Sequence, residues 1–128
     1  MRLQFVREGK DAPLMLIAGR DPEGLAALRD AARRLTVEID EWIVMEHLAG
    51  FSSLSGCSLV MTTETKVRPG VTPVSRISFR WNRDPEGWAE VADLVEPFLH
   101  SLAGARNRFQ HLENDGGINV VLSADGSW

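Results

Sequence analysis

The pentapeptide Arg20-Asp21-Pro22-Glu23-Gly24 recurs unchanged as Arg83-Asp84-Pro85-Glu86-Gly87, 63 residues further along the chain. Each copy lies between an apolar run and a helical pattern, and its composition suits the start of a helix. The aspartate accepts hydrogen bonds from free N–H groups, the proline fits the first turn, and the glutamate complements the helix dipole. The repeated stretch therefore predicts two helices at corresponding places in a duplicated unit. The alternative is that two unrelated helices share a common start signal.

The correspondence continues beyond the pentapeptide. Glu46-His47-Leu48 matches Gln110-His111-Leu112 at an offset of 64, and Gly56 matches Gly117 at an offset of 61, each glycine opening an apolar run. These matches predict two tandem βαββ repeats, over residues 13–65 and 74–124 approximately. They also place His47 and His111 at equivalent positions.

Apolar spacing predicts the individual elements. Leu25, Leu28, Ala32 and Leu35 recur at helical spacing, and a second helix from Asp84 carries Trp88, Val91, Val95 and Phe98 towards the interior. Strands are expected over residues 1–6, 14–18, 41–48, 57–64, 76–81, 109–113 and 118–123, with residues 66–73 as the junction between the repeats. Within these strands Ile77, Phe79 and Trp81 face the core, and Trp42 is also expected to pack. The whole chain, 1–128, is predicted to be one α+β domain, a two-layer sandwich with a mostly antiparallel sheet and two helices on one face.

Composition excludes several classes of protein. Hydrophobic residues make up 44% and charged residues 25% of the chain, as in ordinary globular domains. No apolar run is long enough to span a membrane, and charges interrupt the N-terminal segment, so we expect a soluble, cytoplasmic protein without a membrane partner. The net charge of −4 argues against nucleic acid and favours a basic partner. The single cysteine, Cys57, is expected to be a buried, unreactive thiol.

No catalytic, nucleotide or cofactor motif is apparent, so we expect neither enzymatic activity nor a bound cofactor. His47 and His111 are the weak candidates for a metal site, since equivalent residues of two repeats can meet at a pseudo-axis. Zinc and iron sites need three or four ligands, and no recognised ligand spacing accompanies these histidines. A histidine beside the core or at a sheet edge is the simpler interpretation.

Four residues are candidates for contact with a partner. Arg76 and Arg80 alternate with apolar residues and are expected on the exposed face of a strand. Glu46 precedes His47, and Trp128 is a large aromatic residue that either folds back or contacts a partner. One sheet face is left without a helix to cover it, so it is solvated, covered by a loop or buried against another molecule.

Several motifs together resemble a known family. Asp21-Pro22-Glu23-Gly24-Leu25, with Leu28 and Leu35, is followed by Glu46-His47-Leu48 and then by Leu54 and Gly56-Cys57-Ser58-Leu59-Val60. This order resembles immunity protein family thirty-two of bacterial polymorphic toxin systems, in which a Gly-Leu helix precedes a histidine-containing strand and a last apolar strand. The resemblance covers about half of the chain. The chain departs from the family by its second copy and by a single histidine where the family tends to show a pair. The resemblance implies a bacterial protein that binds and blocks a toxin without catalysis.

The leading hypothesis is thus a non-enzymatic protein-binding module that acts as an immunity protein or inhibitor. One alternative is a small ligand-binding or metal-dependent enzyme with its site at the join of the repeats, near His47 and His111. Another is a homodimeric structural module that buries the open sheet face.

Overall fold

The computed structural model describes residues 1–9, 13–38, 40–100, 109–114 and 117–126. Two helices and nine strands are found in these ranges, together with a short 3-10 helix. The helices are α1 (Pro22–Leu35) and α2 (Pro85–His100), and the 3-10 helix is η1 (Met45–His47). The strands are β1 (Arg2–Val6), β2 (Leu14–Ala18), β3 (Trp42–Val44), β4 (Ser52–Ser53), β5 (Ser58–Thr62), β6 (Gly70–Pro73), β7 (Ser78–Asn82), β8 (Phe109–Glu113) and β9 (Asn119–Ser123).

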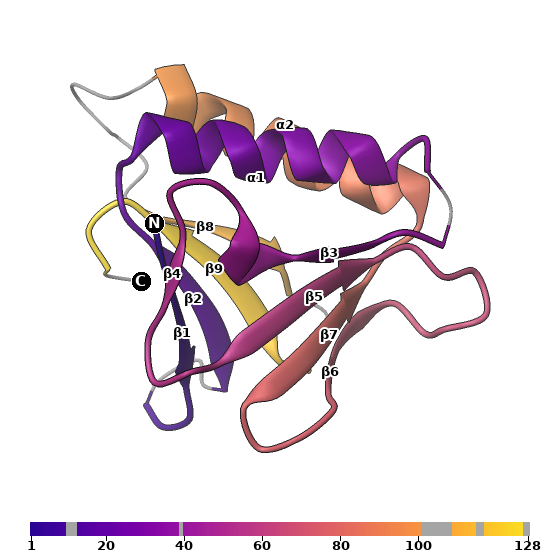
Figure 1. Ribbon diagram of the computed structural model, residues 1–128, viewed down its shortest axis with the longest axis horizontal. Coiled ribbons are helices and arrows are strands. Elements are labelled where there is room, and N and C mark those ends of the chain that lie inside the picture. Colours follow the sequence, from indigo (N-terminus) through magenta and orange to yellow (C-terminus); the bar gives the residue numbers. More distant parts are fainter. Residues whose placement is uncertain (10–12, 39, 101–108, 115–116, 127–128) are drawn as a thin grey trace.

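The strands form two sheets beneath a layer of two helices (Figure 1). Sheet A has the order β4-β1-β2-β9-β8, and sheet B has the order β3-β5-β7-β6. The α+β sandwich class is confirmed, with both helices on the same side. The expected single sheet is instead two sheets, and both contain parallel pairs: β1–β4 and β2–β9 in sheet A, and β5–β7 in sheet B. The two strands of a parallel pair cannot be joined by a tight hairpin, so a longer connection separates them in each case.

The two sheets share one pattern, in which a hairpin from one half of the chain pairs with strands from the other half. Ile17 of β2 lies opposite Leu122 of β9, as Trp81 of β7 lies opposite Met61 of β5. The halves are therefore interleaved, and neither half builds a sheet alone. A common origin of the two halves stays a prediction.

The register does not place His47 and His111 at equivalent positions. Trp42 begins β3 opposite Thr62, and Phe109 begins β8 opposite Ser123, so His111 corresponds to Val44. The strand expected over residues 41–48 ends at Val44, because the chain then turns into η1 and buries Met45. His47 consequently lies on a 3-10 turn, whereas His111 lies on a strand.

The repeated pentapeptide starts both helices as expected. The Asp21 carboxylate accepts a hydrogen bond from the N–H of Glu23 at 3.1 Å, and that of Asp84 accepts one from the N–H of Gly87 at 2.7 Å. Both glycines are buried, and neither has room for a side chain. A Cβ on Gly24 would collide with the Met1 side chain, and one on Gly87 would collide with Arg83.

The main core lies between the helix layer and the two sheets. The residues expected on the inner face of α1 are all buried, as are Trp81 and Trp88, whose rings pack edge to face at 4.8 Å. Two expected core residues are not in the core. Trp42 is 54% exposed and Ile77 is 45% exposed, because Ile77 belongs to the turn before β7 and not to the strand. The expected junction over residues 66–73 contributes an edge strand, β6.

A buried polar contact joins the two sheets. The indole N–H of Trp81, on β7, donates to Glu113 Oε1, on β8, at 2.9 Å, and the Arg83 guanidinium lies 3.7 Å from the same oxygen. A β-bulge between His111 and Glu113 interrupts the alternation of β8, so Leu112 and Glu113 are both buried. Glu113 thus reaches across the core and fixes how the two sheets meet.

Candidate functional site

The most prominent surface feature is an aromatic residue held between two charges at one edge of sheet B. Trp42 opens β3, and its indole N–H donates to Glu64 Oε1 at 3.0 Å. The Arg80 guanidinium lies over the Trp42 ring, 4.7 Å from the ring centre, and its Nη1 is 3.8 Å from Glu64 Oε2. We call these three residues the Trp42 cluster.

The Trp42 cluster is a preorganised surface. A cation–π contact of this kind contributes about 0.5–1 kcal/mol at an exposed site, and the hydrogen bond to Glu64 also holds the indole. Arg80 Nε is buried and has no hydrogen-bond partner in the described part of the chain, so the guanidinium is fixed mainly by Trp42 and Glu64. A side chain that is already ordered loses little rotamer entropy when a partner binds it.

Strand β3 is a free edge of sheet B. It pairs with β5 on one side only, and no backbone hydrogen bond joins Trp42, Ile43 or Val44 to any other element among the described residues. In an antiparallel pair the N–H and C=O groups of alternate residues point away from the partner strand. The outer side of β3 therefore presents backbone groups that another chain can pair with.

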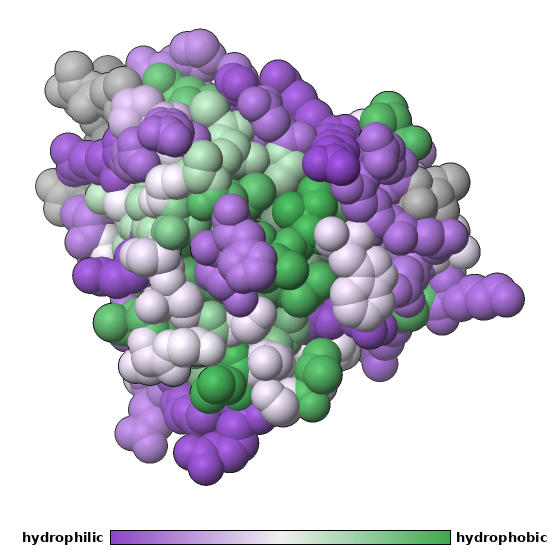
Figure 2. Space-filling model, in the orientation of Figure 1, coloured by the Kyte–Doolittle hydropathy of each residue, from purple (hydrophilic) through white to green (hydrophobic). Residues whose placement is uncertain are grey.

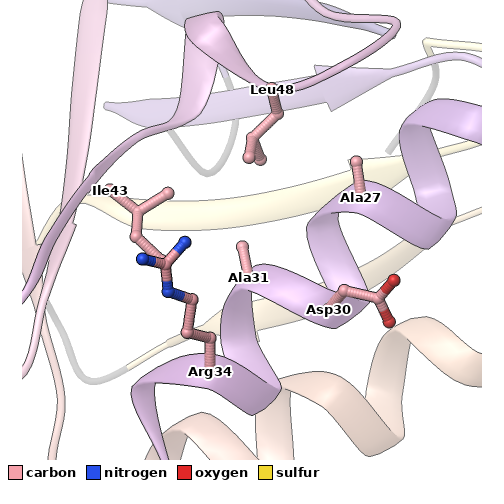
Figure 3. Close-up of a pocket in the computed structure, with 6 residues that line it drawn as sticks. All are labelled: Ala27, Asp30, Ala31, Arg34, Ile43 and Leu48. Carbon is pink, nitrogen blue, oxygen red and sulfur yellow. The ribbon is translucent and has the colours of Figure 1, made fainter. Parts of the chain in front are cut away.

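A groove runs between α1 and the segment formed by β3 and η1. It has a volume of about 220 Å³ and is lined by Ala27, Asp30, Ala31, Arg34, Ile43 and Leu48. The four apolar side chains point into this space, the Arg34 guanidinium reaches towards Ile43, and the Asp30 carboxylate points away (Figure 3). On the molecular surface, hydrophobic residues gather beneath α1 and hydrophilic residues surround them (Figure 2). The groove is smaller than the 300–1,000 Å³ typical of small-molecule sites, so it suits a single side chain better than a ligand.

Acidic residues dominate the segment that leads into β3. Arg34 forms ion pairs with Glu41 and with Glu38, the latter at 4.0 Å. The nearby Glu38 carboxyl group, together with burial, raises the pKa of Glu41. Glu41 Oε2 is buried and accepts no hydrogen bond from the described residues. The carboxylates of Glu38 and Asp40 are exposed, so this end of the groove is suited to a further cation.

The expected partner-contact residues do not form one surface. Arg80 belongs to the Trp42 cluster, whereas Arg76 is exposed in the β6–β7 turn, at the opposite end of sheet B, and its carbonyl accepts a hydrogen bond from Arg7 at 3.1 Å. The Glu46 carboxylate accepts the N–H of Leu59 at 3.1 Å, so it supports the fold at the start of β5. Trp128 lies outside the described residues. Contact of these residues with a partner stays a prediction.

The two histidines lie in different surroundings. His47 is exposed on η1, which packs against sheet B, whereas His111 is half-buried on sheet A with its ring 5.9 Å from that of Phe109. In the part of the chain that the structure describes, no three His, Cys, Asp or Glu side chains are grouped so that they could hold a metal ion. Cys57 is buried, and its thiol is 3.5 Å from the carbonyl of Leu3.

No known protein family, curated protein or solved structure matches this chain. Neither described helix combines the length and apolar composition needed to cross a membrane. On the described surface, the Trp42 cluster with its adjoining groove and free edge is the strongest candidate site.

Proposed function

We propose that this chain is a non-enzymatic protein-binding module that inhibits a partner protein, as an immunity protein inhibits a toxin, and that the Trp42 cluster contacts the partner. The observation that carries the proposal is the exposed indole of Trp42, held between Arg80 and Glu64. Tryptophan and arginine are enriched among the few residues that supply most of the free energy of protein–protein binding.

Other features support a binding role. Buried polar contacts, such as that between Trp81 and Glu113, join structural elements of the fold. The net charge of −4 favours a basic partner, and the resemblance to immunity proteins is consistent with inhibition. In this proposal the protein acts in the bacterial cytoplasm, a reducing compartment in which the thiol of Cys57 stays free.

The test compares wild-type protein with Trp42→Ala and with Phe109→Ala as bait in extracts of the source organism. Phe109 is a matched control, because it is 43% exposed and begins edge strand β8 as Trp42 begins β3. The captured partner is then purified, and its affinity and activity are measured with each variant. We expect Trp42→Ala to weaken binding and inhibition about 30-fold, the effect of losing roughly 2 kcal/mol at a hot spot, and Phe109→Ala to retain both.

Two results would contradict the proposal. One is a partner that binds wild-type protein and Trp42→Ala equally well, and the other is the absence of any stoichiometric partner. Native mass spectrometry of the protein alone adds a further comparison. A dimer that Trp42→Ala converts to monomer would assign the cluster to self-association instead.

A further inference from the structure

We infer that the partner supplies an extended segment that pairs with the free edge of β3, with an aliphatic side chain in the groove and a lysine or arginine beside the Trp42 cluster. This inference rests on the proposed function and specifies the chemistry of the partner. It unites three features that lie side by side: the unpaired edge, the groove and the exposed cluster.

The free edge provides the backbone contacts. Because β3 pairs with β5 alone among the strands that the structure describes, alternate residues of Trp42–Val44 direct their N–H and C=O groups away from sheet B. A strand added here lies about 4.8 Å from β3 and completes those hydrogen bonds. Main-chain pairing provides affinity, and side-chain pockets on either side of the strand provide specificity.

The alternation of side chains connects the edge to the two surfaces beside it. Ile43 points inwards and lines the groove, whereas Trp42 lies on the outer face of sheet B with Arg80. A strand paired with β3 follows the same alternation, so its successive residues face the groove and the Trp42 cluster in turn. Neighbouring residues of the partner segment must therefore differ in chemistry.

The groove selects an aliphatic residue. Ala27 and Ala31 are one helical turn apart on α1, and their small side chains leave the space that Ile43 and Leu48 border from the other side. The volume of about 220 Å³ is apolar at its centre. A charged side chain there would be desolvated without a partner, which costs free energy, whereas an aliphatic one gains from burial.

The surface around the Trp42 cluster favours a basic residue of the partner. Glu38, Asp40 and Glu41 lead into β3, and Glu64 lies beside Trp42. In the ion pairs of the described residues, Arg34 contacts Glu38 and Glu41, and Arg80 contacts Glu64. These four carboxylates therefore share two guanidinium groups. A lysine or arginine of the partner lies near this negative charge and reaches the exposed carboxylates of Glu38 and Asp40.

The first experiment selects peptides from a phage-displayed library of random linear heptapeptides on the immobilised wild-type protein. We expect enriched sequences in which an aliphatic residue has lysine or arginine as an immediate neighbour. No enrichment, or apolar residues at the helical spacing of i, i+3 or i+4 and i+7, would overturn the inference.

Two measurements on an enriched peptide then test the geometry. Ala27→Phe fills the groove, whereas Ala26→Phe changes the adjacent, equally half-buried residue, which does not line it. With circular dichroism confirming that both variants fold, we expect Ala27→Phe to weaken peptide binding at least tenfold and Ala26→Phe to leave it within twofold. Methylating the peptide nitrogens one at a time should abolish binding at every second residue, because only alternate N–H groups face β3. Strand pairing would be refuted if Ala27→Phe and Ala26→Phe changed peptide affinity equally, or if methylation of every peptide nitrogen had the same effect on affinity.

Failure of this inference is distinguishable from failure of the proposed function. A captured partner that depends on Trp42 but binds Ala27→Phe normally would retain the inhibitor function and exclude strand addition. The opposite result is also informative. If selected peptides respond as expected to Ala27→Phe and to N-methylation but no partner protein is captured, the strand-pairing site is supported and the inhibitor function is not. A dimer of the chain that Ala27→Phe dissociates would identify a second copy as the occupant and overturn the assignment to a foreign partner.

Discussion

Replacing Glu113 with leucine tests whether the contact between the two sheets stabilises the fold. The side chain is 7% exposed, and its Oε1 accepts the indole N–H of Trp81, which is fully buried. Leucine removes that acceptor and leaves the N–H without a partner, at a cost of about 2 kcal/mol. With an unfolding entropy of about 2.1 cal/mol/K per residue, this loss lowers the Tm of a 128-residue chain by about 7 °C.

Glu113→Gln is the matched control, since glutamine keeps a carbonyl oxygen for the Trp81 indole and removes only the charge facing Arg83. We expect it to lose less than about 1 kcal/mol, because Arg83 still donates to the Leu112 carbonyl, at 3.2 Å. Thermal unfolding followed by circular dichroism, with urea unfolding followed by tryptophan fluorescence, gives both values. Equal stability of the two variants, or a leucine variant as stable as wild type, would refute the role assigned to this hydrogen bond.

Three further predictions concern the helix layer, a turn and the thiol. A hydrogen bond with His100, aided by nearby arginines, lowers the pKa of Glu96 in the folded protein. The Glu96 carboxylate therefore stabilises the folded state fully above its unfolded-state pKa of about 4.3, and this stabilisation is lost as the pH falls through the folded-state pKa. The difference in Tm between wild type and Glu96→Gln should therefore shrink on acidification, and a constant difference would disprove the linkage. Gly50 has a φ of 78°, and a Cβ added there would collide with the Asp21 carboxylate. Gly50→Ala should therefore lower the free energy of unfolding in urea titrations by about 1–2 kcal/mol. An unchanged urea midpoint would contradict the conformational requirement for glycine. Cys57 is 3% exposed, so a thiol reagent should modify it far more slowly in native protein than in urea, and equal rates would contradict its burial.

Local signals in the sequence were sufficient to locate both helices. Asp21 and Asp84 cap them as expected, and Leu25 and Leu28 are buried where helical spacing put them. Tertiary pairing was not predictable in the same way. The pairing of β2 with β9 joins strands about a hundred residues apart, and hydrophobic patterning specifies the face of a strand but not its neighbour.

The candidate site was predicted only in part. Arg80 was identified because it alternates with Phe79 and Trp81, which fix the inner face of β7. Trp42 was missed, because an apolar run does not reveal that its strand ends after three residues at the free edge of a sheet. The groove beside Ala27 also depends on how α1 crosses β3, a relation between distant segments that no local pattern encodes.

The interleaved pairing of the halves has a consequence for synthesis on the ribosome. All five residues of β2 are buried, yet β9, its neighbour on the side away from β1, begins 105 residues after β2 does. At about 5–20 residues per second, the apolar stretch Leu14–Ala18 waits roughly 5–20 s for that partner to be made. During that interval the edge of β2 away from β1 is unpaired and can pair with another chain, so chaperone dependence in the cell should exceed that of helical proteins of similar size.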